Sequence, residues 1–238
     1  MVKCKKCGSE RYVKNGKARG QQKYLCKECG CNFIEGDRRT NEKIQARKAM
    51  CIMLYATGRM SINKIAKIFN MCWSLVYRWI KEAAEKLEEY KIKDDIKEIE
   101  FDEMWHFLYK KRKIWVIKAY DRDKKEMIAW VTGTRSAKTF KKLYDKVKHL
   151  KNCIFYTDSW DAFSKVLPKE RHIIGKQHTV AIEQDNSNIR NDLARFTRRT
   201  KVVSKSEYMI NLTLKLWQAL HSSSLFYHLQ TILLSVFM

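Results

Sequence analysis

The stretch CIFYTDSW, residues 153–160, has the pattern of a short buried strand that stops on a carboxylate. Its first five residues are apolar or favour strands, as expected inside a sheet, and Asp158 ends the run. An aspartate in this position is often no more than a cap for the following turn. The function of Asp158 therefore depends on whether other acids are placed to meet it.

A second acid follows another apolar run. Residues 97–101 predict a strand, and Asp102 comes directly after it. The runs KIWVIKAY and EMIAWVT, joined by the turn DRDK, predict a hairpin beside that strand. Ser136 is expected to cap a helix that continues to Leu150. The order βββαβα predicts a mixed sheet covered by helices.

A third acid lies on a predicted helix, residues 179–196. The apolar side chains of this segment recur at helical spacing, and Glu183, Asn186 and Arg190 share another face. Glu183 packed beside the two strand ends could therefore converge with Asp102 and Asp158 on one point.

Three crowded carboxylates repel one another unless a cation neutralises them. Oxygen ligands suit Mg²⁺ or Mn²⁺, and two such ions, about 4 Å apart, can promote attack on a phosphodiester and stabilise its leaving oxygen. The sequence thus predicts a catalytic magnesium or manganese site at Asp102, Asp158 and Glu183. The alternative is a set of solvated surface acids, and Glu103, Asp161 and Asp185 are neighbours that could be confused with the ligands.

The charge of the chain favours a polyanionic partner. The 238 residues include 49 Lys and Arg against 26 Asp and Glu, a net charge of +23. Such an excess concentrates nucleic acid, so double-stranded DNA is the expected partner. We find no secretory signal, and the apolar end LFYHLQTILLSVFM is shorter than a membrane span. We therefore expect no membrane role and a reducing compartment.

Two CxxC pairs near the N-terminus predict a structural zinc site. Cys4 and Cys7 precede Cys26 and Cys29 by a short segment with two strand-like runs and a glycine-containing loop, which is the pattern of a zinc ribbon. Cys31 is close enough to replace the fourth ligand. A ribbon this small has little apolar core, so the metal is expected to fold it.

The next segment predicts a helix-turn-helix. A helix from Asn41 ends near Gly58, Ser61 caps a short second helix, and a third helix runs over residues 73–90. A generic three-helix bundle is the alternative, and the positive charge favours DNA binding. Four side chains on the third helix are expected to contact phosphates or base edges: Ser74, Tyr77, Arg78 and Lys81.

The segments FDEMW, YTDSW and GKQHTVAIEQDNSNIRNDLARFTRRT resemble the DDE transposases of the insertion-sequence-one family. In that family a zinc ribbon and a helix-turn-helix precede a ribonuclease-H-like catalytic domain. The resemblance implies that Asp102, Asp158 and Glu183 form the metal-binding triad and that Arg190 holds DNA near it. It also implies a cytoplasmic, nucleoid-associated prokaryotic protein. Further basic residues would line the DNA path: Arg195, Arg198, Arg199 and Lys201.

These observations predict a multidomain protein of mixed α+β and α/β class. We expect a zinc ribbon over residues 1–36, a helix-turn-helix over 40–92, a ribonuclease-H-like domain over 97–221 and an atypical apolar tail over 222–238. The predicted function is a transposase that binds element ends, as a homodimer or higher oligomer, and cleaves and joins DNA strands. The alternative is a DNA-binding regulator with an inert C-terminal domain, which would have no reason to gather three acids.

Overall fold

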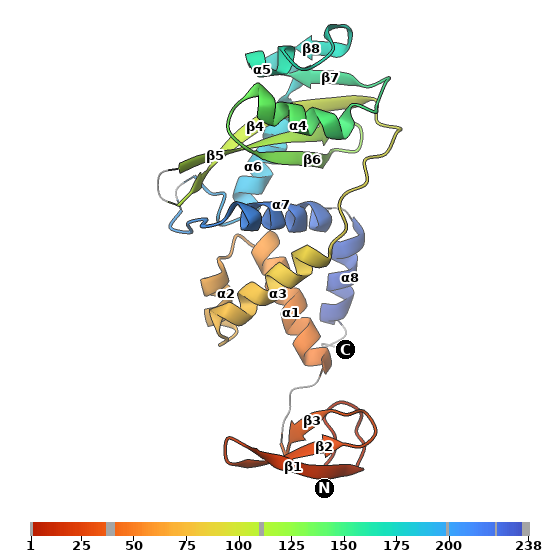
Figure 1. Ribbon diagram of the computed structural model, residues 1–238, viewed down its shortest axis with the longest axis vertical. Helices are drawn as coiled ribbons and strands as arrows, with labels where there is room; N and C mark the ends of the chain where they lie inside the picture. Colours follow the sequence, from red (N-terminus) through yellow and green to blue (C-terminus); the bar gives the residue numbers. More distant parts are fainter. Residues whose placement is uncertain (1, 37–40, 110–111, 199, 222, 235–238) are drawn as a thin grey trace. The chain divides into compact units, whose positions relative to one another are not determined.

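The computed structural model describes residues 2–36, 41–109, 112–198, 200–221 and 223–234 (Figure 1). The chain divides into two compact units, residues 1–50 with 229–238, and residues 51–228. Within the described parts of the chain, no helix is long and apolar enough to cross a membrane.

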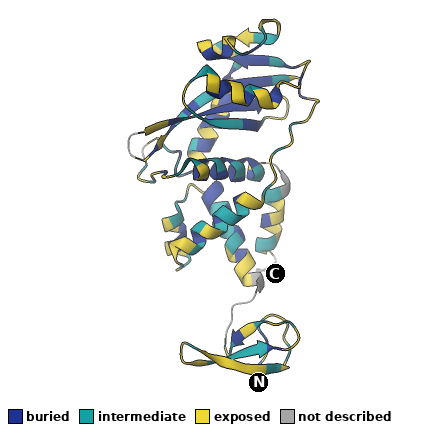
Figure 2. Ribbon diagram, viewed as in Figure 1, coloured by how far each residue is buried: buried dark blue, intermediate teal, exposed yellow. Residues whose placement is uncertain are grey.

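The N-terminal ribbon is a small antiparallel sheet of three strands. They are β1 (Tyr12–Ala18), β2 (Gln21–Cys26) and β3 (Asn32–Ile34), in the order β1-β2-β3. Its buried core consists of Cys4, Cys26 and Phe33, and β1 is mostly exposed (Figure 2). The sequence pattern predicted the first two strands and missed the third. So small a core leaves the cysteines as the main means of holding the ribbon together.

Three helices follow: α1 (Asn41–Ala56), α2 (Ile62–Ile68) and α3 (Trp73–Lys86). As predicted, Ser61 caps α2, its Oγ accepting a hydrogen bond from the backbone N–H of Lys64 over 3.2 Å. The turn between α2 and α3 contains Asn70 with a positive φ of 49°. The third helix ends at Lys86, four residues before the predicted end, because Leu87 has an extended backbone.

The larger unit is built on a five-stranded mixed sheet. Its order is β6-β5-β4-β7-β8, with β5 antiparallel to its two neighbours and β7 and β8 parallel to β4. This order is that of the predicted ribonuclease-H-like fold. The strands are β4 (Glu98–Leu108), β5 (Arg112–Asp121), β6 (Glu126–Gly133), β7 (Ile154–Thr157) and β8 (His172–Ile174).

Helices cover both faces of this sheet. On one face α4 (Ala137–Val147), which lies in front of the sheet in Figure 1, and α5 (Asp161–Ser164) enclose a core that includes Phe101, Phe140 and Phe163. On the other face α6 (Val180–Asp192) and α7 (Glu207–His221) enclose Met104, Ile189 and Trp217. The last helix is α8 (Ser223–Leu234), within the segment predicted as an apolar tail.

Several sequence expectations about these elements were wrong in detail. The first catalytic-domain strand does not stop at Asp102 but continues to Leu108, because the alternation of buried Met104 and His106 persists and β5 pairs along its whole length. The helix expected to continue to Leu150 ends at Val147, and strand β8 was not predicted. The helix expected over residues 179–196 ends at Asp192, since Leu193 is extended.

Candidate active site

Three carboxylates come together at the point on β4 where its pairing with the parallel strand β7 ends. Strand β7 pairs only with Glu98 to Glu100 of β4, so Asp158, just after β7, lies beside the next residues of β4. Asp102 and Glu103 are successive and therefore point to opposite faces of the sheet. Even so, one oxygen each from Asp102, Glu103 and Asp158 lies within 4.8 Å of the others. The edge of β4 lets carboxylates from both faces reach the same place.

Asp158 has two roles in this arrangement. Its Oδ1 accepts a hydrogen bond from the backbone N–H of Trp160 over 2.9 Å, as an ordinary turn aspartate does. It also faces the two carboxylates of β4. The hydrogen bond to Trp160 fixes the side chain of Asp158. The nearby carboxylates of Asp102 and Glu103 distinguish it from an aspartate that only caps a turn.

Burial, assisted by the neighbouring charges, raises the pKa values of Asp102 and Glu103. Burial, with the charges of Asp158 and Glu183, raises the pKa of Asp102 to about 6 against the lowering effect of Lys118. Burial, with the charges of Asp102 and Asp158, raises the pKa of Glu103 to about 7 although Arg135 opposes the shift. These carboxylates are therefore held at a cost in electrostatic energy, which a bound cation would relieve.

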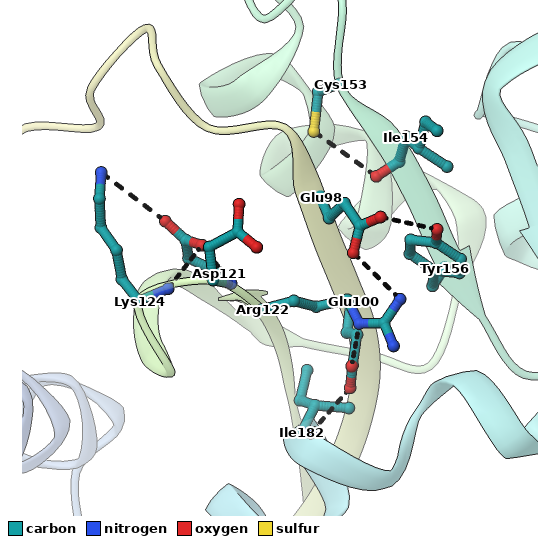
Figure 3. Close-up of polar contacts among 10 residues, drawn as sticks. Glu98, Glu100, Asp121, Arg122, Lys124, Cys153, Ile154, Tyr156 and Ile182 are labelled. Carbon is teal, nitrogen blue, oxygen red and sulfur yellow. Dashed lines mark hydrogen bonds and ion pairs between the residues drawn. The ribbon is translucent and has the colours of Figure 1, made fainter.

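Glu100 fixes the start of α6 over the sheet (Figure 3). Its buried carboxylate accepts a hydrogen bond from the backbone N–H of Ile182 over 2.9 Å and forms an ion pair of 2.9 Å with Arg122. The same guanidinium forms an ion pair with Glu98 over 3.2 Å and lies 4.3 Å from the centre of the Tyr156 ring. A carboxylate at a helix N-terminus is electrostatically favourable, and here it sets the register of the helix that carries Glu183.

Two side-chain contacts fix the next turn of α6. Lys118 on β5 is completely buried and donates a hydrogen bond to Asp185, which is 8% exposed. Asn186 donates from Nδ2 to Oδ2 of Asp102 over 2.6 Å. Asp102 and Lys118 are paired residues of adjacent strands, so these contacts tie α6 to β4 and β5 at one level of the sheet.

Glu183 and Arg190 lie in a cleft next to the cluster. The cleft has a volume of about 670 Å³ and is lined by Arg59, Asp102, Glu103, Glu183, Asn186, Ser187, Arg190, Asn191, Thr197 and Arg198. Glu183 is exposed and stands outside the group of carboxylates whose oxygens lie within 4.8 Å. The structure thus brings Asp102, Asp158 and Glu103 together, with Glu183 close enough to raise the pKa of Asp102.

Two buried oxygens beside Asp102 bear on whether a metal fits. Among the described residues, neither Glu103 Oε2 nor Asn186 Oδ1 has a hydrogen-bond donor. Buried acceptors are normally satisfied, and the exceptions commonly mark an ion or water. Carboxylate and amide oxygens are the donor set that Mg²⁺ and Mn²⁺ prefer. The residues present therefore fit a divalent cation.

The predicted DNA-binding side chains of α3 differ in their exposure to solvent and in their contacts with other residues. On α3, Ser74 and Arg78 are exposed and Tyr77 is half-buried, whereas Lys81 contacts Glu85 over 3.6 Å and the Tyr208 ring. Arg78 lies 3.8 Å from Glu82. Trp73, at the start of α3, is 58% exposed.

The basic residues in the last turn of α6 and after it also differ in position. Arg190 and Arg198 line the cleft, while the Arg195 guanidinium lies 5.8 Å from the Tyr55 ring and 3.4 Å from Ser204 Oγ. Lys201 is exposed. Arg199 lies outside the described residues. The first two arginines are thus the ones placed beside the carboxylates.

The four ribbon cysteines converge. Sγ of Cys4 lies 3.5 Å from Sγ of Cys29, and Sγ of Cys7 lies 3.6 Å from that of Cys26. A tetrahedral zinc with bonds of about 2.3 Å separates its sulfurs by roughly 3.8 Å, so the spacing fits. Cys31 is not in this group, and its thiol lies 3.5 Å from the backbone oxygen of Asn32.

The ribonuclease-H-like sheet, its acid cluster and the helix-turn-helix define a DNA-processing enzyme that carries its own DNA-binding module. Comparison with known proteins agrees: residues 96–218, just over half of the chain, match the model of the IS1 transposase family, and residues 47–87 match a helix-turn-helix domain. The chain belongs to the IS1 transposase family and is a DDE-type transposase.

The curated relatives include insertion element proteins from enteric bacteria. The Insertion element IS1 protein InsB of Shigella flexneri is 34% identical over 108 residues, 45% of this chain and 82% of that protein. The Insertion element IS1 2 protein InsB of Escherichia coli K12 is 36% identical over 108 residues, 45% of this chain and 65% of that protein.

Among solved structures, the catalytic domain of Mos1 mariner transposase aligns with 82% of this chain and 90% of its own, at 11% identity and a TM-score of 0.38. The structure of the Mos1 catalytic domain and Raltegravir with Mn aligns with a TM-score of 0.37 at 11% identity.

Several residues of the site were missed by sequence reasoning. Glu103 was considered only as a residue that could be mistaken for a ligand, although its position next to Asp102 is a usable signal in a strand whose edge is open. Lys118 and Arg135 lie within apolar or turn segments and have no pattern that points to the acids. Arg59, between α1 and α2, reaches the cleft only through the tertiary fold.

Proposed function

We propose that this transposase binds the ends of an insertion element and performs metal-dependent cleavage and joining of DNA strands. The observation that supports this best is the meeting of Asp102 and Asp158 at the edge of β4, beside a cleft containing Glu183 and Arg190. A binding protein without chemistry gains nothing from buried carboxylates with raised pKa values.

Asp102, Asp158 and Glu183 are the proposed ligands of the catalytic ions. Bound Mg²⁺ or Mn²⁺ would supply the activation of the attacking water or 3′-hydroxyl and the stabilisation of the leaving oxygen. Asn186 orients Asp102 by its hydrogen bond, and Glu100 with Asp185 fixes α6 so that Glu183 stays over the cleft. Rigid support of this kind keeps reacting groups in place during the reaction.

Basic residues in and around the cleft hold the DNA backbone. Arg190 and Arg198 carry guanidinium groups on the same cleft as Asp102, where they can bind the phosphates on either side of the scissile bond. Arg59 extends this positive lining from the helix-turn-helix side of the chain. Phosphate contacts position the strand and carry no sequence information.

Recognition of the element ends is assigned to α3. Ser74 and Arg78 are exposed there, and Tyr77 is partly so, which suits contacts to base edges in a major groove. The ribbon binds one zinc ion through Cys4, Cys7, Cys26 and Cys29. A homodimer or higher oligomer on DNA would bring two element ends together.

The test is a strand-transfer assay with Mg²⁺ or Mn²⁺ on oligonucleotide or supercoiled DNA. Asp158→Asn keeps an acceptor for the Trp160 N–H, so folding and end binding should survive. Cleavage and joining should fall by at least about 10²-fold, because charge stabilisation at the reacting phosphate is lost. Asp161→Asn, an exposed acid on the adjacent helix, is the matched control and should behave as the wild type.

The outcome also separates the enzyme from a regulator. An active wild type whose Asp158→Asn variant joins DNA at a normal rate would remove the metal triad. A wild type that binds ends but neither cleaves nor joins DNA would instead support an inert catalytic domain.

A further inference from the structure

We infer that Glu103 is a fourth carboxylate ligand of the catalytic cation site and that Arg135 positions it. This inference rests on the proposed metal-dependent function and adds a residue that the triad of Asp102, Asp158 and Glu183 does not include. It comes from the arrangement of buried side chains at the edge of β4.

The position of Glu103 is unusual for an ion-paired glutamate. Its side chain is only 5% exposed, and one of its oxygens lies within 4.8 Å of oxygens of both Asp102 and Asp158. Glu183 does not belong to that group. Glu103 therefore lies closer to the two aspartates than Glu183, the glutamate that the family resemblance implies as a ligand.

Arg135 holds one Glu103 oxygen and leaves the other unpaired. Its Nε and Nη2 donate to Oε1 over 2.9 and 2.6 Å, and its guanidinium lies 5.1 Å from the Trp115 ring centre and 5.0 Å from that of Trp160. Stacking on two tryptophans limits the freedom of the guanidinium. In the part of the chain that the structure describes, no donor reaches Oε2.

A structural ion pair would not explain this geometry. Arginine can bind both oxygens of a carboxylate side by side, and that arrangement would satisfy Glu103 completely. Here both donors go to Oε1, and Oε2 is buried without a hydrogen-bond donor among the described residues. One oxygen of the same carboxylate lies within 4.8 Å of oxygens of Asp102 and Asp158, where a positive charge is needed. A divalent cation meets both requirements at once.

The experiment measures Mn²⁺ binding to the full, zinc-loaded chain by calorimetry and by the electron paramagnetic resonance signal of free Mn²⁺. Glu103→Gln keeps the volume of the side chain and should weaken binding by about 10-fold or more. Arg135→Gln removes the ion-pair partner but keeps the negative charge, so it should weaken binding much less. Asp161→Asn is the surface control and should bind as the wild type does.

A second measurement separates direct ligation from a through-space charge effect. Terbium luminescence lifetimes in H₂O and D₂O count the waters bound to a Tb³⁺ ion that replaces Mn²⁺. Loss of a protein ligand in Glu103→Ala should add about one water to the ion. A charge effect alone would lower the affinity and leave the water count unchanged, and that result would overturn the inference.

The remaining outcomes are equally distinct. If Glu103→Gln binds Mn²⁺ like the wild type while Asp102→Asn does not bind it, Glu103 is no ligand but the proposed function stands. If Arg135→Gln binds Mn²⁺ as tightly as the wild type, Arg135 does not position Glu103 and that part of the inference fails. If the wild type itself binds no Mn²⁺, the proposed metal-dependent function fails first.

Discussion

The side-chain amide of Asn186 on α6 donates a hydrogen bond to the carboxylate of Asp102 on β4, with 2.6 Å between Nδ2 and Oδ2. This contact joins the helix that carries Glu183 to the strand that carries the central acid. Together with the Glu100 contact at Ile182 and the Lys118 ion pair at Asp185, it means that α6 cannot shift without breaking several buried polar interactions.

Asn186→Leu removes the hydrogen bond that orients Asp102 and leaves its carboxylate in place, so the variant tests orientation independently of charge. Removal of the buried donor to a carboxylate is expected to lower the free energy of unfolding by about 1.5 to 3 kcal/mol, and Mn²⁺ affinity should fall although every carboxylate remains. Urea unfolding and calorimetry measure the two effects. Asn188→Ala, an exposed residue of the same helix, should change neither. Unchanged Mn²⁺ binding in Asn186→Leu would show that Asp102 needs no such support.

Removal of Lys118 alone should lower the stability of the fold much more than removal of both Lys118 and Asp185. Lys118→Met leaves Asp185 buried without its cation and should cost about 3 to 5 kcal/mol. The double variant Lys118→Met with Asp185→Leu removes both charges and should regain most of that loss, as measured by urea unfolding. A double variant as unstable as Lys118→Met would mean that Lys118 mainly serves the neighbouring Asp102.

Zinc removal should unfold the ribbon and leave the larger unit folded. The buried core of the ribbon is Cys4, Cys26 and Phe33, too small to replace four metal bonds. Metal analysis of protein purified without chelator should find one zinc per chain. Cys26→Ser should lose it, and Cys72→Ser, an exposed thiol outside the ribbon, should retain it. Protein without zinc but with an intact ribbon in NMR spectra would contradict this.

His106 should make the fold sensitive to acid. Burial, with the charge of Arg195, lowers the pKa of His106 to about 4 from its ordinary 6.5. Between these values the unfolded chain binds a proton that the folded chain does not. The part of the free energy of unfolding that depends on His106 is therefore fully present above about pH 6.5 and is lost as the pH falls to about 4. It amounts to at most on the order of 3 kcal/mol.

The measurement is the urea midpoint of wild type and His106→Asn from pH 7 to pH 4.5. Asparagine can keep a polar contact to Ser204, whose Oγ lies 2.8 Å from His106 Nε2, but it does not titrate. The variant should therefore lose less stability on acidification. His149→Asn, which changes an exposed ring, should follow the wild type. Parallel curves for wild type and His106→Asn would contradict the prediction.

Arg78→Ala should weaken binding to element ends more than binding to random DNA. Arg78 is exposed on α3, whereas Lys81 is engaged with Glu85 and Tyr208, so Lys81→Ala should have the smaller effect on specificity. Equilibrium binding at several salt concentrations measures both, with a log-log slope of about −0.9 for each phosphate contact. An equal loss on both DNAs would make Arg78 a backbone contact.

The sequence determined the parts that depend on local patterns. The two CxxC pairs predicted the group of four thiols. The Ser61 cap and the helical segments on either side of it predicted the helix-turn-helix, and apolar runs with turn signals between them predicted a mixed sheet. Asp158 was correctly placed directly after a strand. Such signals are local because capping, turn geometry and side-chain alternation act over a few residues.

Only the tertiary structure decided which side chains share the site. Strand β4 continues past Asp102 because β5 pairs with it over its full length, a contact between segments that no local pattern specifies. The early end of the β4–β7 pairing then opens an edge where Glu103, from the opposite face, reaches Asp102 and Asp158. Lys118, Asn186 and Arg135 join them through packing of residues distant in sequence. Burial at that edge, which no single segment creates, is what raises the carboxylate pKa values and makes a cation the natural partner of the site.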